Sequence, residues 1–335
     1  MEKILVTGAA GFIGMHLTKA LCELGHFVVG YDNINDYYDV NLKYARLKEL
    51  GISINEAKEY NVKCESVSLP FEFYRSNLED LDFMSSIFDL YKFDRVIHLA
   101  AQAGVRYSIE NPHAYGQSNL VGFLNILDSC RHFKIENLLY ASSSSIYGNS
   151  TDVPFTTCQN VDLPISLYAA TKKSNELMAH AYSHLYDINT IGLRFFTVYG
   201  PWGRPDMAMF LFTDAIFNKK PIKVFNQGDL SRDFTYIDDI TQGIIKLLKK
   251  KPSEKYQLFN IGNSKPVQLM DFIREVENKT GLTAELEMLP MQPGDVNQTW
   301  ADVTELINKY DYQPNFPISK GVENFVDWYR NYYKK

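Results

Sequence analysis

The sequence has few cysteines and no pair of them at a metal-binding or redox spacing. Its four cysteines lie at positions 22, 64, 130 and 158, and none belongs to a C-x-x-C pair. This pattern favours reduced thiols over a disulfide framework or a zinc site. The seven histidines are scattered and no H-E-x-x-H motif occurs. The sequence therefore predicts no metal centre.

Long apolar runs and an excess of positive charge are also missing. No apolar stretch approaches the ~18 residues that a membrane-spanning helix needs. The first residues predict no secretory signal, because their apolar run is only Ile4 to Val6. Lys and Arg number 34 against 40 Asp and Glu, for a formal net charge of −6. A nucleic-acid-binding protein is typically basic, so we expect a cytoplasmic protein with neither a nucleic-acid nor a membrane partner.

Apolar strand-like runs alternate with helical patterns through the first 196 of the 335 residues. The predicted strands are 4–6, 27–31, 73–75, 95–99, 138–141 and 190–193, and the predicted helices are 12–24, 42–50, 81–91, 115–132 and 168–186. This alternation predicts an α/β fold with a Rossmann-type doubly wound parallel sheet.

The second part of the chain, residues 197–335, is punctuated by prolines and has shorter patterns. We expect it to form a smaller mixed α/β region that binds the substrate. Segments near 230–262, such as 257–261, are expected to return to the first sheet. The polar stretch 55–69 is predicted to be a surface insertion.

A glycine-rich turn stands between the first predicted strand and the first predicted helix. Gly8, Gly11 and Gly14 have the spacing G-x-x-G-x-x-G. Glycine permits a tight turn and a close approach of the backbone to a pyrophosphate, which the helix N-terminus favours electrostatically. Asp32 ends the second strand, where a carboxylate can bind ribose hydroxyls and would repel a 2′-phosphate. The motif therefore predicts NAD rather than NADP as cofactor.

Tyr168 and Lys172 form a Y-x-x-x-K motif that places both side chains on one helical face. A nearby ammonium and an oxidised nicotinamide favour the phenolate. Lowering the pKa of a tyrosine from ~10 towards 7 requires about 4 kcal/mol. Such a tyrosine can remove a hydroxyl proton while a hydride leaves the same carbon. Upstream, the predicted strand 138–141 runs into four serines, Ser142 to Ser145, at the sheet edge where ligands of open α/β sheets bind.

Together these motifs resemble the extended short-chain dehydrogenase/reductase family, and within it the NAD-dependent nucleotide-sugar epimerases. The strings that carry the resemblance are TGAAGFIG, HLAAQAGVRYS, ASSSSIYG, YAATK, LRFFTVYGPWGRPDM, RDFTYIDDI and MQPGDV. They extend over nearly the whole chain, and the subgroup that they most resemble is that of the UDP-glucuronate 4-epimerases. The resemblance also implies a homodimer, paired through the helices that begin near His113 and Tyr168.

The resemblance implies a catalytic set and a cofactor set. Ser143 matches the catalytic Ser/Thr position, Tyr168 the catalytic tyrosine and Lys172 its lysine. The implied NAD contacts are Gly8, Gly11, Phe12, Ile13, Gly14, Asp32, Asn33, Asn77, Leu78, Leu99, Ala100, Ala101, Tyr168 and Lys172. Relatives often carry Asp where Asn77 stands, but an amide carbonyl can also accept a hydrogen bond from the adenine amino group.

The resemblance further implies a site for a UDP-sugar. Thr197 and Arg204 match positions that hold the sugar carboxylate in this subgroup. The other implied substrate contacts are Arg106, Ser144, Ser145, Lys223, Val224, Phe225, Arg232, Gln292 and Asp295. Relatives that act on galactose often have Arg where Gln292 stands, so we expect Arg232 and Lys223 to share the binding of the diphosphate.

The serine string separates the reactions that this family carries out after oxidation at C4. Dehydratases need an acidic pair beside the catalytic Ser/Thr, and decarboxylases usually carry a Glu there. Ser143 to Ser145 contain no carboxyl group, which favours plain epimerisation through a 4-keto intermediate. The resemblance to the subgroup implies that the reaction converts UDP-glucuronate to UDP-galacturonate. Two alternatives remain: a 4-epimerase of a neutral UDP-hexose or UDP-N-acetylhexosamine, and a UDP-glucuronate decarboxylase. A non-catalytic NAD-sensing module is a remote third.

Overall fold

The computed structural model describes residues 1–291 and 296–335. Its contacts divide the chain into two compact units. The first unit comprises Met1–Gly148, Asn160–Arg194 and Leu247–Phe259, and the second comprises Asn149–Gln159, Phe195–Lys246 and Asn260–Lys335. Residues 149–159, which the sequence pattern assigns to the first region, therefore group with the second.

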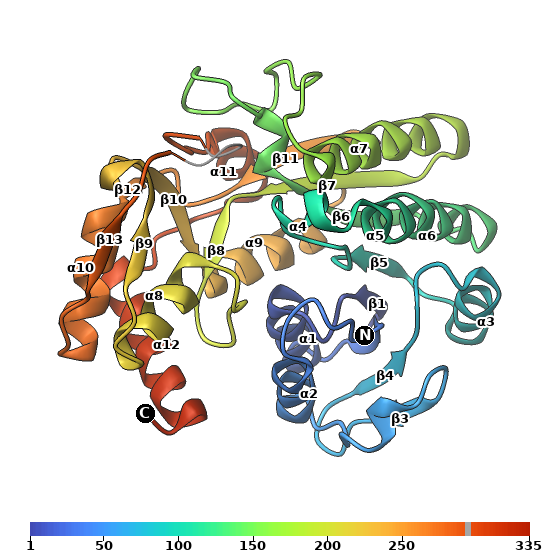
Figure 1. Ribbon diagram of the computed structural model, residues 1–335. Helices are drawn as coiled ribbons and strands as arrows, with labels where there is room; N and C mark the ends of the chain where they lie inside the picture. The colour runs from blue at the N-terminus through green and yellow to red at the C-terminus, as the bar shows by residue number, and fades with distance from the viewer. Residues whose placement is uncertain (292–295) are drawn as a thin grey trace. The chain divides into compact units, whose positions relative to one another are not determined.

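An eight-stranded sheet in the order β11-β7-β6-β5-β1-β2-β4-β3 forms the centre of the first unit (Figure 1). Its strands are β1 (Lys3–Thr7), β2 (Phe27–Asp32), β3 (Lys63–Glu65), β4 (Phe71–Arg75), β5 (Arg95–His98), β6 (Asn137–Ser143), β7 (Asn189–Phe195) and β11 (Tyr256–Ile261). β1 pairs in parallel with β2 and β5, and only the pairing of β3 with β4 is antiparallel among the described ladders of this sheet. The predicted α/β class is confirmed, and β11, which contains residues 257–261, pairs at the edge of this sheet.

Helices cover the sheet because their apolar stripes face it. The main helices are α1 (Phe12–Glu23), α2 (Val40–Glu49), α3 (Leu81–Tyr91), α6 (Gly122–His132) and α7 (Leu167–Tyr186). One core cluster joins α3 and α6 to strands β1, β2, β5 and β6, with Phe88, Phe123 and Tyr140 fully buried in it. Ser166 caps α7 by accepting a hydrogen bond from the Ala169 N–H at 3.1 Å, which fixes where this helix begins.

The predicted helix 115–132 is interrupted in the structure. It consists of α5 (Pro112–Tyr115), a π-helical segment η2 (Gly116–Val121) and then α6. A π-helical turn contains an extra residue, and here it turns the buried Asn119 towards Gln102 and Thr171. A regular helix of period 3.6 would direct this amide elsewhere, and the sequence pattern does not predict the change.

The stretch 55–69 is more than a surface insertion. It contains a short 3-10 helix, η1 (Glu56–Lys58), and strand β3, whose Cys64 is buried while its two neighbours are exposed. Three residues are too few to produce a recognisable alternation of polar and apolar side chains. The strand exists because β4 offers it a paired edge.

The second unit is a mixed α/β arrangement of small sheets and helices. Its strands are β8 (Thr197–Tyr199), β9 (Ile222–Val224), β10 (Ser231–Tyr236), β12 (Pro266–Gln268) and β13 (Leu286–Met288). Its helices are α8 (Ala208–Phe217), α9 (Ile237–Lys249, which ends in the first unit), α10 (Leu269–Thr280), α11 (Thr304–Tyr310) and α12 (Ile318–Tyr333). β10 pairs in parallel with β8 and antiparallel with β12. Among the described helices, none combines the length and the hydropathy needed to cross a membrane.

Candidate active site

The turn between β1 and α1 requires all three of its glycines. Gly8 has a φ of +75°, and a Cβ there would lie 2.8 Å from the nitrogen of Ala100. A Cβ on Gly14 would lie 2.0 Å from the Gly8 carbonyl oxygen. The Gly11 N–H donates to that same oxygen at 2.9 Å. A side chain at any of these positions would fill the cradle or push the helix away from the strand.

The N-terminus of α1 fits the pyrophosphate of a dinucleotide. The helix begins at Phe12 with Gly11 as its N-cap, and no side chain of the described residues caps it. Its first turn, Phe12 to Met15, contains no acidic residue. Uncapped amides and the positive end of the helix dipole favour an anion. The described residues therefore fit NAD at this turn.

Asp32 lies beside this turn and is held there by two backbone donors. Its carboxylate accepts from the Ala10 N–H at 3.2 Å and from the Ile34 N–H at 2.8 Å. The next residue, Asn33, accepts at its carbonyl from Arg75 Nε at 3.1 Å. Asp32 thus stands at the end of β2, next to the turn between β1 and α1. This is where a carboxylate that binds the ribose hydroxyls is expected.

The remaining predicted cofactor residues follow strands β4 and β5. Asn77 is exposed, whereas Leu78 is 6% exposed and belongs to the core. Leu99, Ala100 and Ala101 are half-buried after β5. The Leu99 and Ala100 N–H groups donate to the carbonyl and the hydroxyl of Thr7, each at 3.2 Å.

The structure joins the tyrosine–lysine helix to the serine strand. Tyr168 and Lys172 stand one turn apart near the start of α7, as the spacing predicts. Lys172 is 2% exposed, and its ammonium donates to the Ala141 carbonyl of β6 at 2.8 Å. Tyr168 is half-buried and its ring packs edge-on against Tyr115, with centroids 6.0 Å apart.

Burial lowers the pKa of Lys172 and of His98, which interact electrostatically. Burial lowers the pKa of Lys172 to about 8, although the Glu176 carboxylate acts in the opposite direction. At neutral pH the ammonium therefore remains the major form. Burial, and then the charge of Lys172, lower the pKa of His98 to about 3. His98 is thus a neutral imidazole at neutral pH, and it shares a hydrogen bond of 2.9 Å with the Thr7 hydroxyl.

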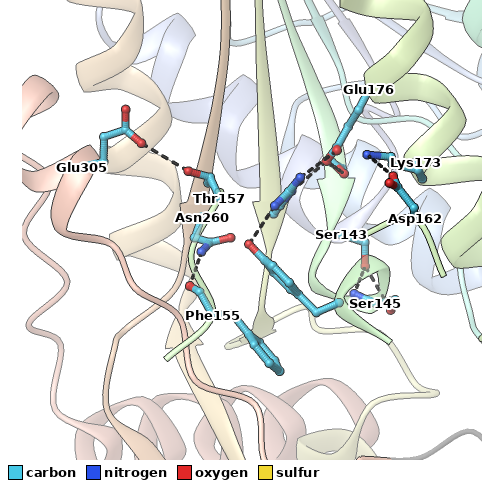
Figure 2. A network of polar contacts seen from close by, with 12 residues as sticks. Ser143, Ser145, Phe155, Thr157, Asp162, Lys173, Glu176, Asn260 and Glu305 are labelled. Atoms are coloured by element: carbon cyan, nitrogen blue, oxygen red, sulfur yellow. Dashed lines mark hydrogen bonds and ion pairs between the residues drawn. The ribbon is translucent and has the colours of Figure 1, made fainter. Parts of the chain in front are cut away.

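The serine string forms a closed hydrogen-bonded turn at the end of β6. The Ser143 hydroxyl accepts from the Ser145 N–H and donates to the Ser145 hydroxyl, both at 3.1 Å (Figure 2). Ser143 is 7% exposed and caps the 3-10 helix η3 (Ser144–Tyr147). Ser144 and Ser145 are half-buried, and Arg106, which precedes α4 (Tyr107–Glu110), is exposed.

In the second unit, Thr197 lies on β8 opposite Phe234 of β10. The other predicted carboxylate contact, Arg204, has an acidic partner that the sequence analysis did not consider. Arg204 Nε lies 3.0 Å from Asp206 Oδ1, and its Nη2 bonds the second oxygen at 2.5 Å. The two side chains are 25% and 28% exposed. Asp206 could have been suspected, because it stands two residues away in the same loop.

Three further predicted substrate residues lie on β9 and just after it. Lys223 is exposed, opposite Glu287 of β13. Val224 is fully buried, and its carbonyl accepts from the Leu289 N–H at 2.8 Å. Phe225 is half-buried and opens the turn η4 (Phe225–Gly228).

Arg232 lies on β10, and its side chain contacts the backbone of Asn297. Its Nη1 donates to the Ser231 carbonyl at 2.9 Å and to the Asn297 carbonyl at 3.2 Å. Gln292 and Asp295, which the resemblance implies as further substrate contacts, lie outside the described residues.

Asp233 is a buried carboxylate that the sequence analysis did not single out. It accepts from the N–H groups of Asn263 at 2.7 Å, Ser264 at 3.0 Å and Ala301 at 3.0 Å. Burial raises its pKa, and these donors oppose the rise. The carboxylate therefore fixes two loops beside the strand that carries Arg232.

Glu176 and Arg194 form a buried ion pair in the first unit, and each side chain is 2% exposed (Figure 2). A helical-face argument could have found Glu176, because it follows Lys172 by four residues. No group of His, Cys, Asp and Glu within the described residues could hold a metal ion.

Comparison with known proteins places these features in a family. The model of the NAD dependent epimerase/dehydratase family matches residues 4–262. "Protein CapI" of Staphylococcus aureus is 53% identical, over 99% of this chain and 100% of that protein. A "probable UDP-glucuronate 4-epimerase" of Rhizobium meliloti is 44% identical, over 99% of this chain and 98% of that protein.

A solved structure has the same fold over almost the entire chain. It is the crystal structure of UDP-glucuronic acid 4-epimerase from Bacillus cereus in complex with UDP-glucuronic acid and NAD. Its TM-score is 0.89 at 33% sequence identity, and the match covers 99% of this chain and 100% of that one. The resemblance seen in the sequence motifs is confirmed, and so are the Rossmann-type fold and the cofactor. The chain belongs to the NAD dependent epimerase/dehydratase family and is an NAD-dependent epimerase, an isomerase.

Proposed function

We propose that the chain is a UDP-glucuronate 4-epimerase that interconverts UDP-glucuronate and UDP-galacturonate. The observation that carries this proposal is the pairing of the Tyr168–Lys172 helix with a serine string that contains hydroxyls and no carboxyl group. The comparisons support it, because relatives and a structural neighbour bear this activity in their names.

The proposed chemistry is a reversible oxidation at C4 of the sugar. Tyr168 removes the proton of the C4 hydroxyl, and Ser143 hydrogen-bonds the same oxygen. The buried Lys172 ammonium favours the tyrosine phenolate by charge. NAD held at the β1–α1 turn and Asp32 would supply a reversible hydride acceptor for C4. After the 4-keto sugar has rotated to present its opposite face to the returning hydride, Tyr168 returns the proton and the other epimer forms.

The residues of the first unit that would hold NAD follow from the fit described above. Gly8, Gly11, Phe12, Ile13 and Gly14 would surround the pyrophosphate. Asp32, which two backbone N–H groups already orient, would bind the ribose hydroxyls and discriminate against a 2′-phosphate.

A uronate substrate imposes an additional requirement on the enzyme. A 4-keto-uronate is a β-keto acid, and it loses CO₂ fastest when the breaking C–C bond is perpendicular to the keto plane. Arg204 and Thr197, joined by Ser144 and Ser145, would hold the carboxylate away from that geometry. Arginine is suited to this because its planar guanidinium makes two-point contacts with carboxylates.

We also propose that the enzyme is a homodimer in the cytoplasm. Helices α6 and α7 pack together, and large apolar side chains are exposed at Val121, which ends η2, at Leu124 on α6, and at Leu177 and Leu185 on α7. Apolar side chains gathered on neighbouring helices are typical of a subunit interface. The four cysteines are free thiols, which suits a reducing compartment.

Product analysis tests the proposed function. The purified enzyme is incubated with UDP-glucuronate, and in parallel with UDP-glucose and UDP-N-acetylglucosamine, and the products are resolved by NMR. UDP-galacturonate from UDP-glucuronate is the expected result, and Tyr168→Phe should abolish it while NAD still binds. A UDP-pentose product would indicate a decarboxylase, and preferred turnover of a neutral sugar would indicate a different 4-epimerase. Bound NAD without turnover of any of these sugars would favour the NAD-sensing alternative.

A further inference from the structure

A buried ion pair connects the helix of Tyr168 and Lys172 to the sheet. Glu176 stands one turn beyond Lys172 on α7, and Arg194 is near the end of β7. Arg194 Nε lies 2.9 Å from Glu176 Oε1, and its Nη2 lies 2.9 Å from Oε2 (Figure 2). This is a planar two-point contact, which restricts the orientation of both side chains.

The same pair holds both ends of the serine turn. The Ser142 hydroxyl donates to Glu176 Oε1 at 2.7 Å, and Ser142 immediately precedes Ser143. Arg194 Nη1 donates to the Tyr147 hydroxyl at 3.0 Å, and Tyr147 ends η3. The turn that contains Ser143 and Ser145 is thus held on one side by the carboxylate and on the other by the guanidinium.

Stability alone does not explain a buried pair of this kind. Desolvation of two charges costs about as much as their attraction returns, so apolar residues of similar volume are often equally stable in its place. Unlike apolar residues, the ion pair fixes the orientation of both side chains and of the groups that they hydrogen-bond. We propose that Glu176 is a positioning residue: its carboxylate, oriented by Arg194, fixes the strand end that carries Ser143 against the helix turn that carries Lys172. The inference rests on the roles assigned to these residues under the proposed function.

The charges around Lys172 give this proposal a readout of its own. Among the described residues, the titratable and charged groups near this turn include Tyr168 and Glu176 on α7, Tyr115 on α5, His98 on β5, Tyr140 on β6, Tyr147 on η3, Arg194 on β7 and Tyr256 on β11. His98 is neutral at neutral pH, and burial keeps the pKa of Tyr140 high. Glu176 is the anion that acts on the Lys172 ammonium. Loss of its charge should therefore lower the pKa of Lys172 below about 8.

The first test compares two neighbouring variants of α7. Glu176→Gln should lower kcat by about 10–100-fold, the effect of a small misplacement of reacting groups, with little change in KM. The alkaline limb of its pH–kcat profile should move to lower pH. Lys173→Ala is the matched control, because its ammonium pairs with Asp162 at 3.4 Å at the surface of the same helix. The control should keep the kcat and the pH profile of the parent.

A double variant separates positioning from stability. Glu176→Gln leaves Arg194 buried without its counter-ion, so it could unfold the protein. Glu176→Leu combined with Arg194→Met removes both charges and should return the thermal midpoint close to that of the parent. We expect kcat to remain low in this folded variant and the alkaline limb to remain displaced. If the double variant regains the kcat and the pH profile of the parent together with its stability, the pair is only structural and the inference is wrong.

Ser142→Ala decides the matter if the double variant is itself unstable. It keeps the ion pair and removes only the bond from the serine strand to Glu176. We expect kcat to fall several-fold at an unchanged thermal midpoint, and parent-like turnover would contradict the inference. All variants are assayed with the UDP-sugar that the parent converts best. A change of preferred sugar therefore overturns the proposed function without deciding this test.

Discussion

At the scale of single residues, the guanidinium of Arg204 has a competitor within its own loop. Asp206 already makes a two-point contact with it. Under the proposed function, a sugar carboxylate at Arg204 would have to share the guanidinium or displace Asp206. The two residues should consequently affect substrate choice in opposite directions.

Arg204→Ala should cut kcat/KM for UDP-glucuronate by at least ~10-fold, because a charge-assisted hydrogen bond contributes roughly 1.5–3 kcal/mol. Arg204→Lys should recover only part of this, because an ammonium cannot make the planar contact. Asp206→Asn should instead raise the preference for UDP-glucuronate over UDP-glucose, because it removes the competing anion. The ratio of the two kcat/KM values is the measurement. A shift of this ratio in the same direction in Arg204→Ala and Asp206→Asn would contradict the assignment.

Loss of Arg204 should also expose the intermediate to decarboxylation. With the carboxylate free to rotate, some 4-keto-uronate should lose CO₂, and the Arg204→Ala variant should release a pentose product that the parent does not. NMR can count pentose per epimerisation event. Parent-like epimerisation by Arg204→Ala without any pentose would mean that the carboxylate is held by other residues.

His98 predicts an acid-sensitive component of stability. Its pKa is about 3 in the folded protein against ~6.5 in an unfolded chain. Between these values the unfolded state binds the proton and the folded state does not. The contribution of His98 to the free energy of unfolding is therefore fully present above pH ~6.5. Below that pH, the free energy of unfolding falls by up to about 1.4 kcal/mol per pH unit.

His98→Asn replaces the imidazole with a side chain that does not titrate. Urea unfolding from pH 7 to pH 4.5 should show a shallower loss of stability in this variant than in the parent, whatever the absolute cost of the substitution at pH 7. Parallel pH curves for the two proteins would show that His98 is not the group that takes up the proton.

At the scale of elements, the β1–α1 turn has no space for a side chain at its three glycine positions. Gly14→Ala would bring a Cβ to 2.0 Å from the Gly8 carbonyl oxygen, so the helix must move away from the strand. NAD affinity, measured by calorimetry, should fall by at least ~10-fold, because the helix N-terminus no longer approaches the pyrophosphate. Gly116→Ala is the control, since a Cβ there meets no described atom within 4 Å. Equal loss of NAD affinity in both variants would indicate a general effect on folding.

At the scale of the whole molecule, the exposed apolar side chains of α6 and α7 predict a dimer. Light scattering should give the parent protein a molar mass twice that of its chain, which is 38.5 kDa. Leu177→Glu with Leu185→Glu, at side chains 60% and 65% exposed, should give monomers because charge is costly in an apolar interface. Leu90→Glu on α3, 65% exposed, should leave the dimer intact. A monomeric parent would rule the interface out.

Local sequence order was enough to predict the cofactor, NAD, and the glycine turn that fits it. The strand, the glycine turn, the helix and Asp32 lie within 30 residues of one another, and each has a signal of its own. The Tyr168–Lys172 pair is also local, because four residues of helix place both side chains on one face. The class of fold followed from the regular alternation of strands and helices, since periodicity reports which faces are buried.

Contacts across elements were decided only by the tertiary structure. Arg194 meets Glu176 because β7 lies beside β6 under α7, and strand order leaves no trace in the periodicity of either segment. The π-helical turn at Asn119 likewise places its amide against Thr171, which is distant in sequence, and the three-residue strand β3 depends on its pairing with β4. A buried charge must find a counter-charge, but the sequence alone does not show that Arg194 and Glu176 are buried. Which residue supplies the counter-charge depends on the order in which the strands pair, and that order is a property of the folded chain.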